Sequence, residues 1–61
     1  MTDAIVIEVE GEAVGLVLRE PDGFRFLATH RDQQQMEGRL FRSASAAERA
    51  ALALRRCQEQ D

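Results

Sequence analysis

Two turn signals between stretches of alternating apolar and polar residues constrain the fold of this 61-residue chain most strongly. Gly11-Glu12 places Gly at the first central position of a two-residue type II′ turn, and Pro21-Asp22-Gly23 suits a three-residue bulged hairpin loop. The alternation on either side of these turns is typical of half-buried strands. We therefore predict antiparallel strands at residues 4–10, 13–20 and 24–30.

The same turns predict which residues lie opposite one another. Across the first turn the expected pairs are Glu10 with Ala13, Val9 with Val14, Ile7 with Leu16, and Ile5 with Leu18. Across the second turn they are Glu20 with Phe24, Leu18 with Phe26, Leu16 with Ala28, and Val14 with His30. These pairs bring large apolar residues together on one face, and a slip of one residue would turn each strand's side chains to the other face.

The last third of the chain predicts a helix over residues 46–58. Ser45-Ala46-Ala47-Glu48 has the spacing of a capping box, in which the Ser and Glu side chains bind each other's backbone N–H groups. On a helical wheel the expected buried stripe is Ala47, Ala50, Ala51, Leu54 and Cys57. Leu52 falls on the opposite side, so we expect only one of the two leucines to reach the core.

Residues 31–38 have neither helical nor strand periodicity and read as a polar connection in which Met36 turns inward. Leu40 and Phe41 follow Gly38, so residues 39–43 allow a short fourth strand at the sheet edge. The expected fold class is α+β. A three-stranded or four-stranded antiparallel sheet packs on one C-terminal helix in the order β-β-β(-β)-α, within a single small domain spanning residues 1–61.

Size and composition limit how such a domain is stabilised and where it works. A chain this short buries only about 60% of its unfolded surface, so association with a partner is expected to add to its stability. Cys57 is the only cysteine, which excludes an internal disulfide framework. The N-terminus lacks a signal-peptide pattern, and no run approaches the roughly 20 apolar residues of a membrane span. We expect a cytoplasmic protein with no membrane contact.

The face of the sheet turned away from the helix is the first candidate for binding a partner. In the predicted register it carries a row of apolar residues, with two arginines facing each other one step along. The residues of this candidate surface are Val6, Val17, Leu27, Arg19 and Arg25. Glu20 or Asp22 could neutralise the arginines. An ordinary solvated face explains the same pattern, because small proteins expose many apolar atoms.

The exposed side of the helix is the second candidate, formed by Leu52 with Arg49 and Arg56. No constellation for catalysis accompanies either surface. His30 has no second ligand at a metal-binding spacing, and neither Ser43 nor Ser45 has an evident base. Cys57 on the expected buried stripe suggests a small apolar residue. We therefore expect a non-enzymatic protein with no cofactor, metal or small-molecule substrate.

Several segments give the chain a resemblance to a DNA-binding family. Gly38-Arg39-Leu40-Phe41 and Phe41-Arg42-Ser43 follow three antiparallel strands and lead into Glu48-Arg49-Ala50-Ala51, an order that resembles AP2-type and integrase arm-binding domains. The resemblance implies that the sheet face away from the helix enters a DNA groove, with Arg19 and Arg25 on that face.

Charge separates the three functional hypotheses that remain. The net charge is −3, and residues 1–12 carry four acids and no base. Because phosphate contacts dominate nucleic-acid affinity, this charge favours a protein partner or a second copy of the chain over nucleic acid. The leading hypothesis is a self-associating protein-interaction module. The alternatives are a nucleic-acid-binding module, and a small acidic inhibitor of phage type in which Glu8, Glu10 and Glu12 imitate phosphates.

Overall fold

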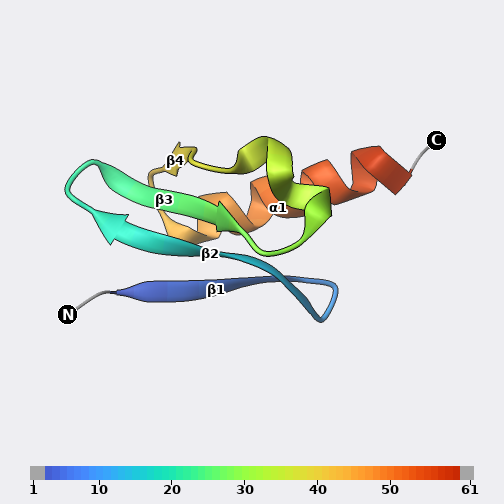
Figure 1. Ribbon diagram of the computed structural model, residues 1–61, viewed down its shortest axis with the longest axis horizontal. Helices are drawn as coiled ribbons and strands as arrows, with labels where there is room; N and C mark the ends of the chain where they lie inside the picture. Colours follow the sequence, from blue (N-terminus) through green and yellow to red (C-terminus); the bar gives the residue numbers. More distant parts are fainter. Residues whose placement is uncertain (1–2, 60–61) are drawn as a thin grey trace.

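The computed structural model describes residues 3–59, with side chains as far as Cys57. A four-stranded antiparallel sheet in the order β1-β2-β3-β4 carries one long helix on its inner face (Figure 1). The elements are β1 Ala4–Val9, β2 Glu12–Glu20, β3 Gly23–Ala28, the 3₁₀ helix η1 Arg31–Met36, β4 Leu40–Phe41 and α1 Ala44–Glu59. The α+β prediction is confirmed, and the fourth strand is present with two residues.

The core lies between the inner face and α1. Phe26 sits at its centre with a fully buried side chain, and its ring meets Phe41 of β4 edge-on with ring centroids 6.4 Å apart. The other buried apolar residues are Ile7, Val9, Val14, Val17, Met36, Ala47 and Ala51. Two small helix residues in this set let the helix axis approach the sheet closely, as the alanine-rich sequence suggested.

The first turn differs from the prediction by one position. Glu10 and Gly11 are its central residues, with φ of 54° and 83°, which is the pair of positive values that a type I′ turn requires. β1 and β2 therefore pair Ile5 with Val17 and Ile7 with Gly15. Nearer the turn the register shifts at a bulge, and Val9 lies opposite Glu12. The predicted Gly11-Glu12 turn and its register are wrong.

The second turn differs in length, because it is one residue shorter than predicted. Pro21 and Asp22 alone form the loop, because Glu20 pairs directly with Gly23. The register of β2 against β3 moves by one, so Val17 lies opposite Phe26. A one-residue slip turns the side chains of β2 over relative to the prediction. Val17 is buried on the inner face, whereas Leu16 and Leu18 point to the outer face.

Gly15 explains why this register holds. The Phe26 ring occupies the space where a side chain at position 15 would lie: a Cβ there would be 2.4 Å from Phe26 Cζ and 2.7 Å from the carbonyl oxygen of Leu27. Contacts that short are not tolerated, so only glycine fits beneath the ring. Alternation of apolar residues carries no information about this fit.

The helix begins two residues earlier than predicted and uses a different cap. The Ser43 hydroxyl accepts a hydrogen bond from the backbone N–H of Ala46 at 3.1 Å, whereas Ser45 is exposed. The capping-box prediction at Ser45 is therefore wrong. Only Arg42 separates β4 from Ser43, so the cap forms just after the chain leaves the sheet.

The buried side of α1 is rotated relative to the predicted stripe. Its centre runs through Ala47, Ala51 and Arg55, spaced by four residues, and Arg55 is only 7% exposed. Cys57 is a free thiol in an exposed position, contrary to the buried position expected. Leu52 and Leu54 both pack half-buried against the core, so the expectation that only one could do so is also wrong.

Candidate interaction surface

The outer face of the sheet is the side that α1 leaves uncovered. We define it by the strand residues whose side chains point away from the helix: Ala4, Val6 and Glu8 of β1, Leu16, Leu18 and Glu20 of β2, Arg25 and Leu27 of β3, and Leu40 of β4. The observed register places Val6 beside Leu16 and Leu16 beside Leu27 in one row across three strands. A second row runs from Ala4 through Leu18 and Arg25 to Leu40.

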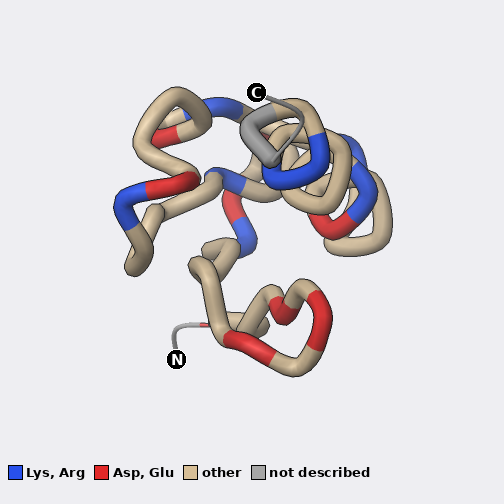
Figure 2. The backbone as a smooth tube through the Cα atoms, turned by 90° about the vertical axis from the view of Figure 1, so that its right-hand side faces the viewer, with Lys and Arg blue, Asp and Glu red and all other residues tan. Residues whose placement is uncertain are grey.

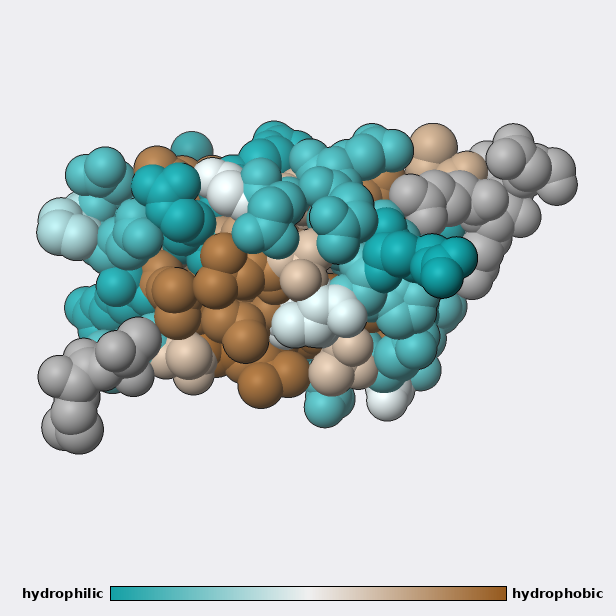
Figure 3. All heavy atoms as spheres, in the orientation of Figure 1, coloured by the Kyte–Doolittle hydropathy of each residue, from teal (hydrophilic) through white to brown (hydrophobic). Residues whose placement is uncertain are grey.

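These rows form an apolar patch over the middle of the sheet, and Figure 3 shows hydrophilic residues above the patch and toward both of its ends. Val6 is 59% exposed and Leu40 is 41% exposed, the high values expected for aliphatic side chains with no layer above them. Leu16, Leu18 and Leu27 are half-buried. Contiguous apolar patches of this kind mark interaction sites more often than single exposed residues do.

The structure keeps some of the predicted surface residues together and separates others. Val6 and Leu27 lie on the outer face as expected, with Leu16 between them in the place assigned to Val17. Val17 is 0% exposed on the inner face, so its predicted place on the surface is wrong. The apolar run 16–18 fits either face, so no local sequence signal could have corrected this prediction.

The two arginines predicted to face each other lie on opposite faces. Arg19 pairs with Phe24, and its guanidinium reaches the Asp3 carboxylate at 3.9 Å with both side chains largely exposed. Arg25 pairs with Leu18 on the outer face. The repulsion expected between these two side chains is therefore absent.

Arg25 is held by its own neighbourhood. Its Nε donates to both carboxylate oxygens of Glu20 at 3.0 Å, and a terminal nitrogen donates to the Gly38 carbonyl at 2.9 Å. The hydrogen bond that Arg25 donates to Glu20, followed by the charge of that carboxylate, raises the pKa of Arg25 above its ordinary value. Glu20 thus neutralises Arg25, one of the two arginines for which Glu20 or Asp22 was expected to do so.

On the helix side, Leu52 is half-buried against the core rather than presented to solvent. Arg49 and Arg56 are exposed as predicted. The two arginines thus lack the exposed leucine that made this side of the helix a second candidate surface. The outer face is the more apolar of the two candidates.

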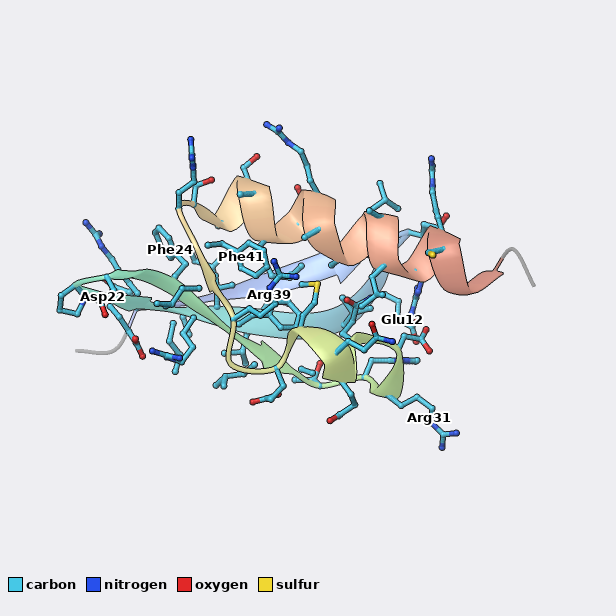
Figure 4. The ribbon with its side chains drawn as sticks, turned by 90° about the horizontal axis from the view of Figure 1, so that it is seen from above. Glu12, Asp22, Phe24, Arg31, Arg39 and Phe41 are labelled. Atoms are coloured by element: carbon cyan, nitrogen blue, oxygen red, sulfur yellow. The ribbon has the colours of Figure 1, made fainter. Side chains whose placement is uncertain are left out.

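One edge of the sheet is closed by the chain itself. The Phe26 N–H donates to the Arg39 carbonyl at 2.8 Å, and the Phe26 carbonyl accepts from the Gly38 N–H at 2.8 Å. The next outward N–H, that of Ala28, donates to the Glu37 carboxylate at 2.7 Å. Figure 4 shows Arg39 beside Phe41, where its guanidinium lies 5.3 Å from the ring centroid. We call this side of β3 the closed edge.

A polar cluster ties the β1–β2 hairpin to η1 and α1. The Arg55 guanidinium lies 2.7 Å from the Glu12 carboxylate and 3.2 Å from that of Asp32, and it also donates to the Val9 carbonyl at 3.4 Å. Figure 4 places Glu12 near the C-terminal half of α1. The hydrogen bond to Glu12 raises the pKa of Arg55 despite its burial. Pairing of this kind explains how an arginine occupies the buried stripe.

His30 completes this cluster. Its Nε2 lies 3.4 Å from Glu12, and its Nδ1 accepts a hydrogen bond from the Asp32 N–H at 3.2 Å, which caps η1. Gln33 then donates from its buried amide to the Ala51 carbonyl at 3.1 Å. These contacts join three segments of the fold, so the cluster has a structural explanation.

A shallow hollow of about 300 Å³ lies between η1 and α1. Its lining residues are Gln35, Met36, Arg39, Ala50, Ala53 and Leu54. None of these lining side chains is a carboxylate, imidazole or thiol, so the hollow has no general base or nucleophile among them. Across residues 3–59, no group of three or more His, Cys, Asp or Glu side chains is placed to hold a metal ion.

Within the described part of the chain, no helix combines the length and the apolar character needed to span a bilayer. No family model matches this sequence, and neither a curated protein nor a solved structure is significantly similar to it.

Proposed function

We propose that the protein is a small, non-enzymatic interaction module that self-associates by packing the outer faces of two copies against each other. The observation that carries this proposal is the unbroken row of Val6, Leu16 and Leu27 on the uncovered side of the sheet. Covering this row removes apolar surface from water, which is the dominant favourable term in association.

Charge on the outer face is compatible with a second copy of itself. Its arginine and one of its acids, Arg25 and Glu20, neutralise each other within the chain, which leaves Glu8 at one end of β1 as the remaining charge. Two such faces can therefore meet without placing like charges at their centre. Interfaces that lack charge at the core and carry it at the rim follow the same rule.

Dimensions support the same proposal. The molecule measures 39 × 18 × 17 Å, so a broad face covers about 700 Å² in projection. Stable interfaces bury about 800 Å² per partner, so an interface of that size would take the whole broad face of so small a protein. A thin core also gives the chain a thermodynamic reason to associate, since a domain this short is marginally stable alone.

Nucleic-acid binding by the same face finds less support. Arg19 lies on the opposite face, and the Arg25 guanidinium is already occupied by Glu20 and Gly38. Phosphate contacts need free cationic groups. The acidic-inhibitor alternative is weakened in one respect, because Glu12 is bound by Arg55 and is no longer free to imitate a phosphate.

The test substitutes one outer-face residue with a charge. Leu27→Glu should convert the associated protein to the 6.9 kDa single chain, measured by light scattering over a range of concentrations. Ser45→Glu, which adds the same charge at an exposed position on α1, is the matched control and should leave association intact. Circular dichroism checks that both variants are folded.

Two results would contradict the proposal. One is a wild-type chain that stays monomeric at every concentration. The other is a Leu27→Glu variant that associates as strongly as the control. Salt adds a second discriminator, since apolar association changes little between low and moderate salt, whereas phosphate-driven binding weakens steeply.

A further inference from the structure

Among the described residues, the outward backbone groups of β1 have no neighbouring strand, in contrast to those of β3 at the closed edge. β1 is the terminal strand of the sheet, and its ladder to β2 includes the hydrogen bond from the Arg19 N–H to the Asp3 carbonyl at 3.0 Å. Hydrogen-bonding pairs alternate along an antiparallel ladder, so Ile5 and Ile7 also direct their backbone groups to β2. Ala4 and Val6 therefore direct theirs away from the sheet. We call this side of β1 the open edge.

Two exposed aliphatic side chains lie on opposite sides of this one strand. Ile5 points to the inner face and is 43% exposed, and Val6 points to the outer face and is 59% exposed. A partner packed flat on the outer face would cover Val6 and leave Ile5 in water. A strand that continues the sheet beyond β1 would cover both, because its own side chains alternate between the same two faces.

The charge beside the open edge identifies the kind of strand that fits. Glu8 and Glu10 are exposed and make no ion pair with any residue between positions 3 and 57. Figure 2 shows acidic residues and no basic ones around the turn of the β1–β2 hairpin. A second copy of β1 would bring more carboxylates to this edge, whereas a strand carrying Lys or Arg is attracted to it.

We propose that the open edge binds an extended basic segment of another protein, which adds to the sheet as a strand antiparallel to β1. Its recognition pattern is two consecutive aliphatic residues, one beside Val6 and one beside Ile5, with a Lys or Arg two positions from the first, beside Glu8. Backbone hydrogen bonds to Ala4 and Val6 provide affinity, and the side chains provide selectivity. The open edge shares Val6 with the outer face, but it uses the backbone of Ala4 and Val6 and the side chains of Ile5 and Glu8 instead of Leu16 and Leu27. The inference therefore goes beyond self-association through the outer face.

A blocked peptide, Lys-Thr-Val-Ile-Thr-Lys, is the probe. Titrated against the wild-type chain, it should bind and slow hydrogen exchange at the Ala4 and Val6 amides. Val6→Pro removes an N–H that β2 does not use and should weaken binding by about tenfold or more, the effect of losing one hydrogen bond in a desolvated interface. Val6→Thr keeps that N–H and the branched shape, and it should bind within about threefold of wild type.

A charge comparison keeps the test decisive if Val6→Pro does not fold. Glu8→Lys should reduce affinity for the basic peptide and raise it for the matched acidic peptide, Glu-Thr-Val-Ile-Thr-Glu. Leu27→Glu should leave peptide binding unchanged. Loss of self-association can therefore be told apart from loss of peptide binding. The proposal is overturned if the basic peptide does not protect Ala4 and Val6, if the acidic peptide binds wild type equally well, or if the open edge is protected in the peptide-free protein by a second copy.

Discussion

The two edges of this sheet are built on different principles. At the closed edge, backbone from residues 38 and 39 pairs with the N–H and carbonyl of Phe26, and the Glu37 carboxylate accepts from the Ala28 N–H. At the open edge, no comparable segment lies beside Ala4 and Val6 in the described chain. Proteins normally protect sheet edges because exposed strands pair with other chains. The chain therefore protects the outward backbone groups of β3 and leaves those of β1 available to another strand.

Among the variants that test this comparison, Phe41→Ala should cause the largest loss of stability. Phe41 is the aromatic contact that holds β4 against Phe26. Because it is only half-buried, the loss of unfolding free energy should be about 3 kcal/mol, at the low end for aromatic truncation. Urea unfolding measures it. Leu40→Ala, one residue earlier and 41% exposed, is the control and should cost less than about 1 kcal/mol.

Equal losses for these two variants would mean that β4 is not anchored through its aromatic side chain. Hydrogen exchange tests the same anchoring of β4 independently. The Phe26 amide should be protected in wild type and lose protection selectively in Phe41→Ala.

Glu37→Ala should have a smaller and more local effect. It removes the acceptor for the Ala28 N–H, which is exposed enough for water to replace it, so the cost should be below about 1 kcal/mol. The Ala28 amide should exchange faster, while Glu37→Gln, which keeps an acceptor oxygen, should exchange as wild type does. An unchanged exchange rate at Ala28 in Glu37→Ala would mean that the Glu37 carboxylate does not protect this amide.

Ile5→Thr should have the smallest effect on stability, less than about 0.5 kcal/mol, because its side chain is 43% exposed on the open edge. The same substitution at Ile7, which is 2% exposed two residues along, should cost several times more and serves as the matched comparison. Thermal unfolding of the two variants gives the difference. Similar losses of stability would mean that another molecule covers Ile5 in solution, although the side chain is exposed in the single chain.

Local patterns predicted the strands and the long helix of this fold, but the 3₁₀ helix η1 lies where only a polar connection was expected. Three alternating stretches and an alanine-rich segment each formed the expected structure, and Phe26 and Met36 turned inward as anticipated. Local signals are sufficient there because each depends on a few neighbouring residues. The fourth strand and the free outer face followed from the same reading.

The register could not be predicted in the same way. Residues 16–18 are all large and apolar, so either face of β2 could be buried on periodicity alone. The choice is made by the Phe26 ring over Gly15, a contact between different strands. Arg55 was missed for the same reason, since its partners Glu12 and Asp32 lie far from it in sequence.

Gly15 has one more consequence. By admitting the Phe26 ring on the inner side, it selects the alignment in which Leu16 and Leu18 turn outward. The neighbouring alignment would have shown solvent Val17 and Arg19 instead. The apolar outer face therefore depends on a buried position that carries no side chain, because a Cβ at Gly15 would clash with the Phe26 ring in this alignment.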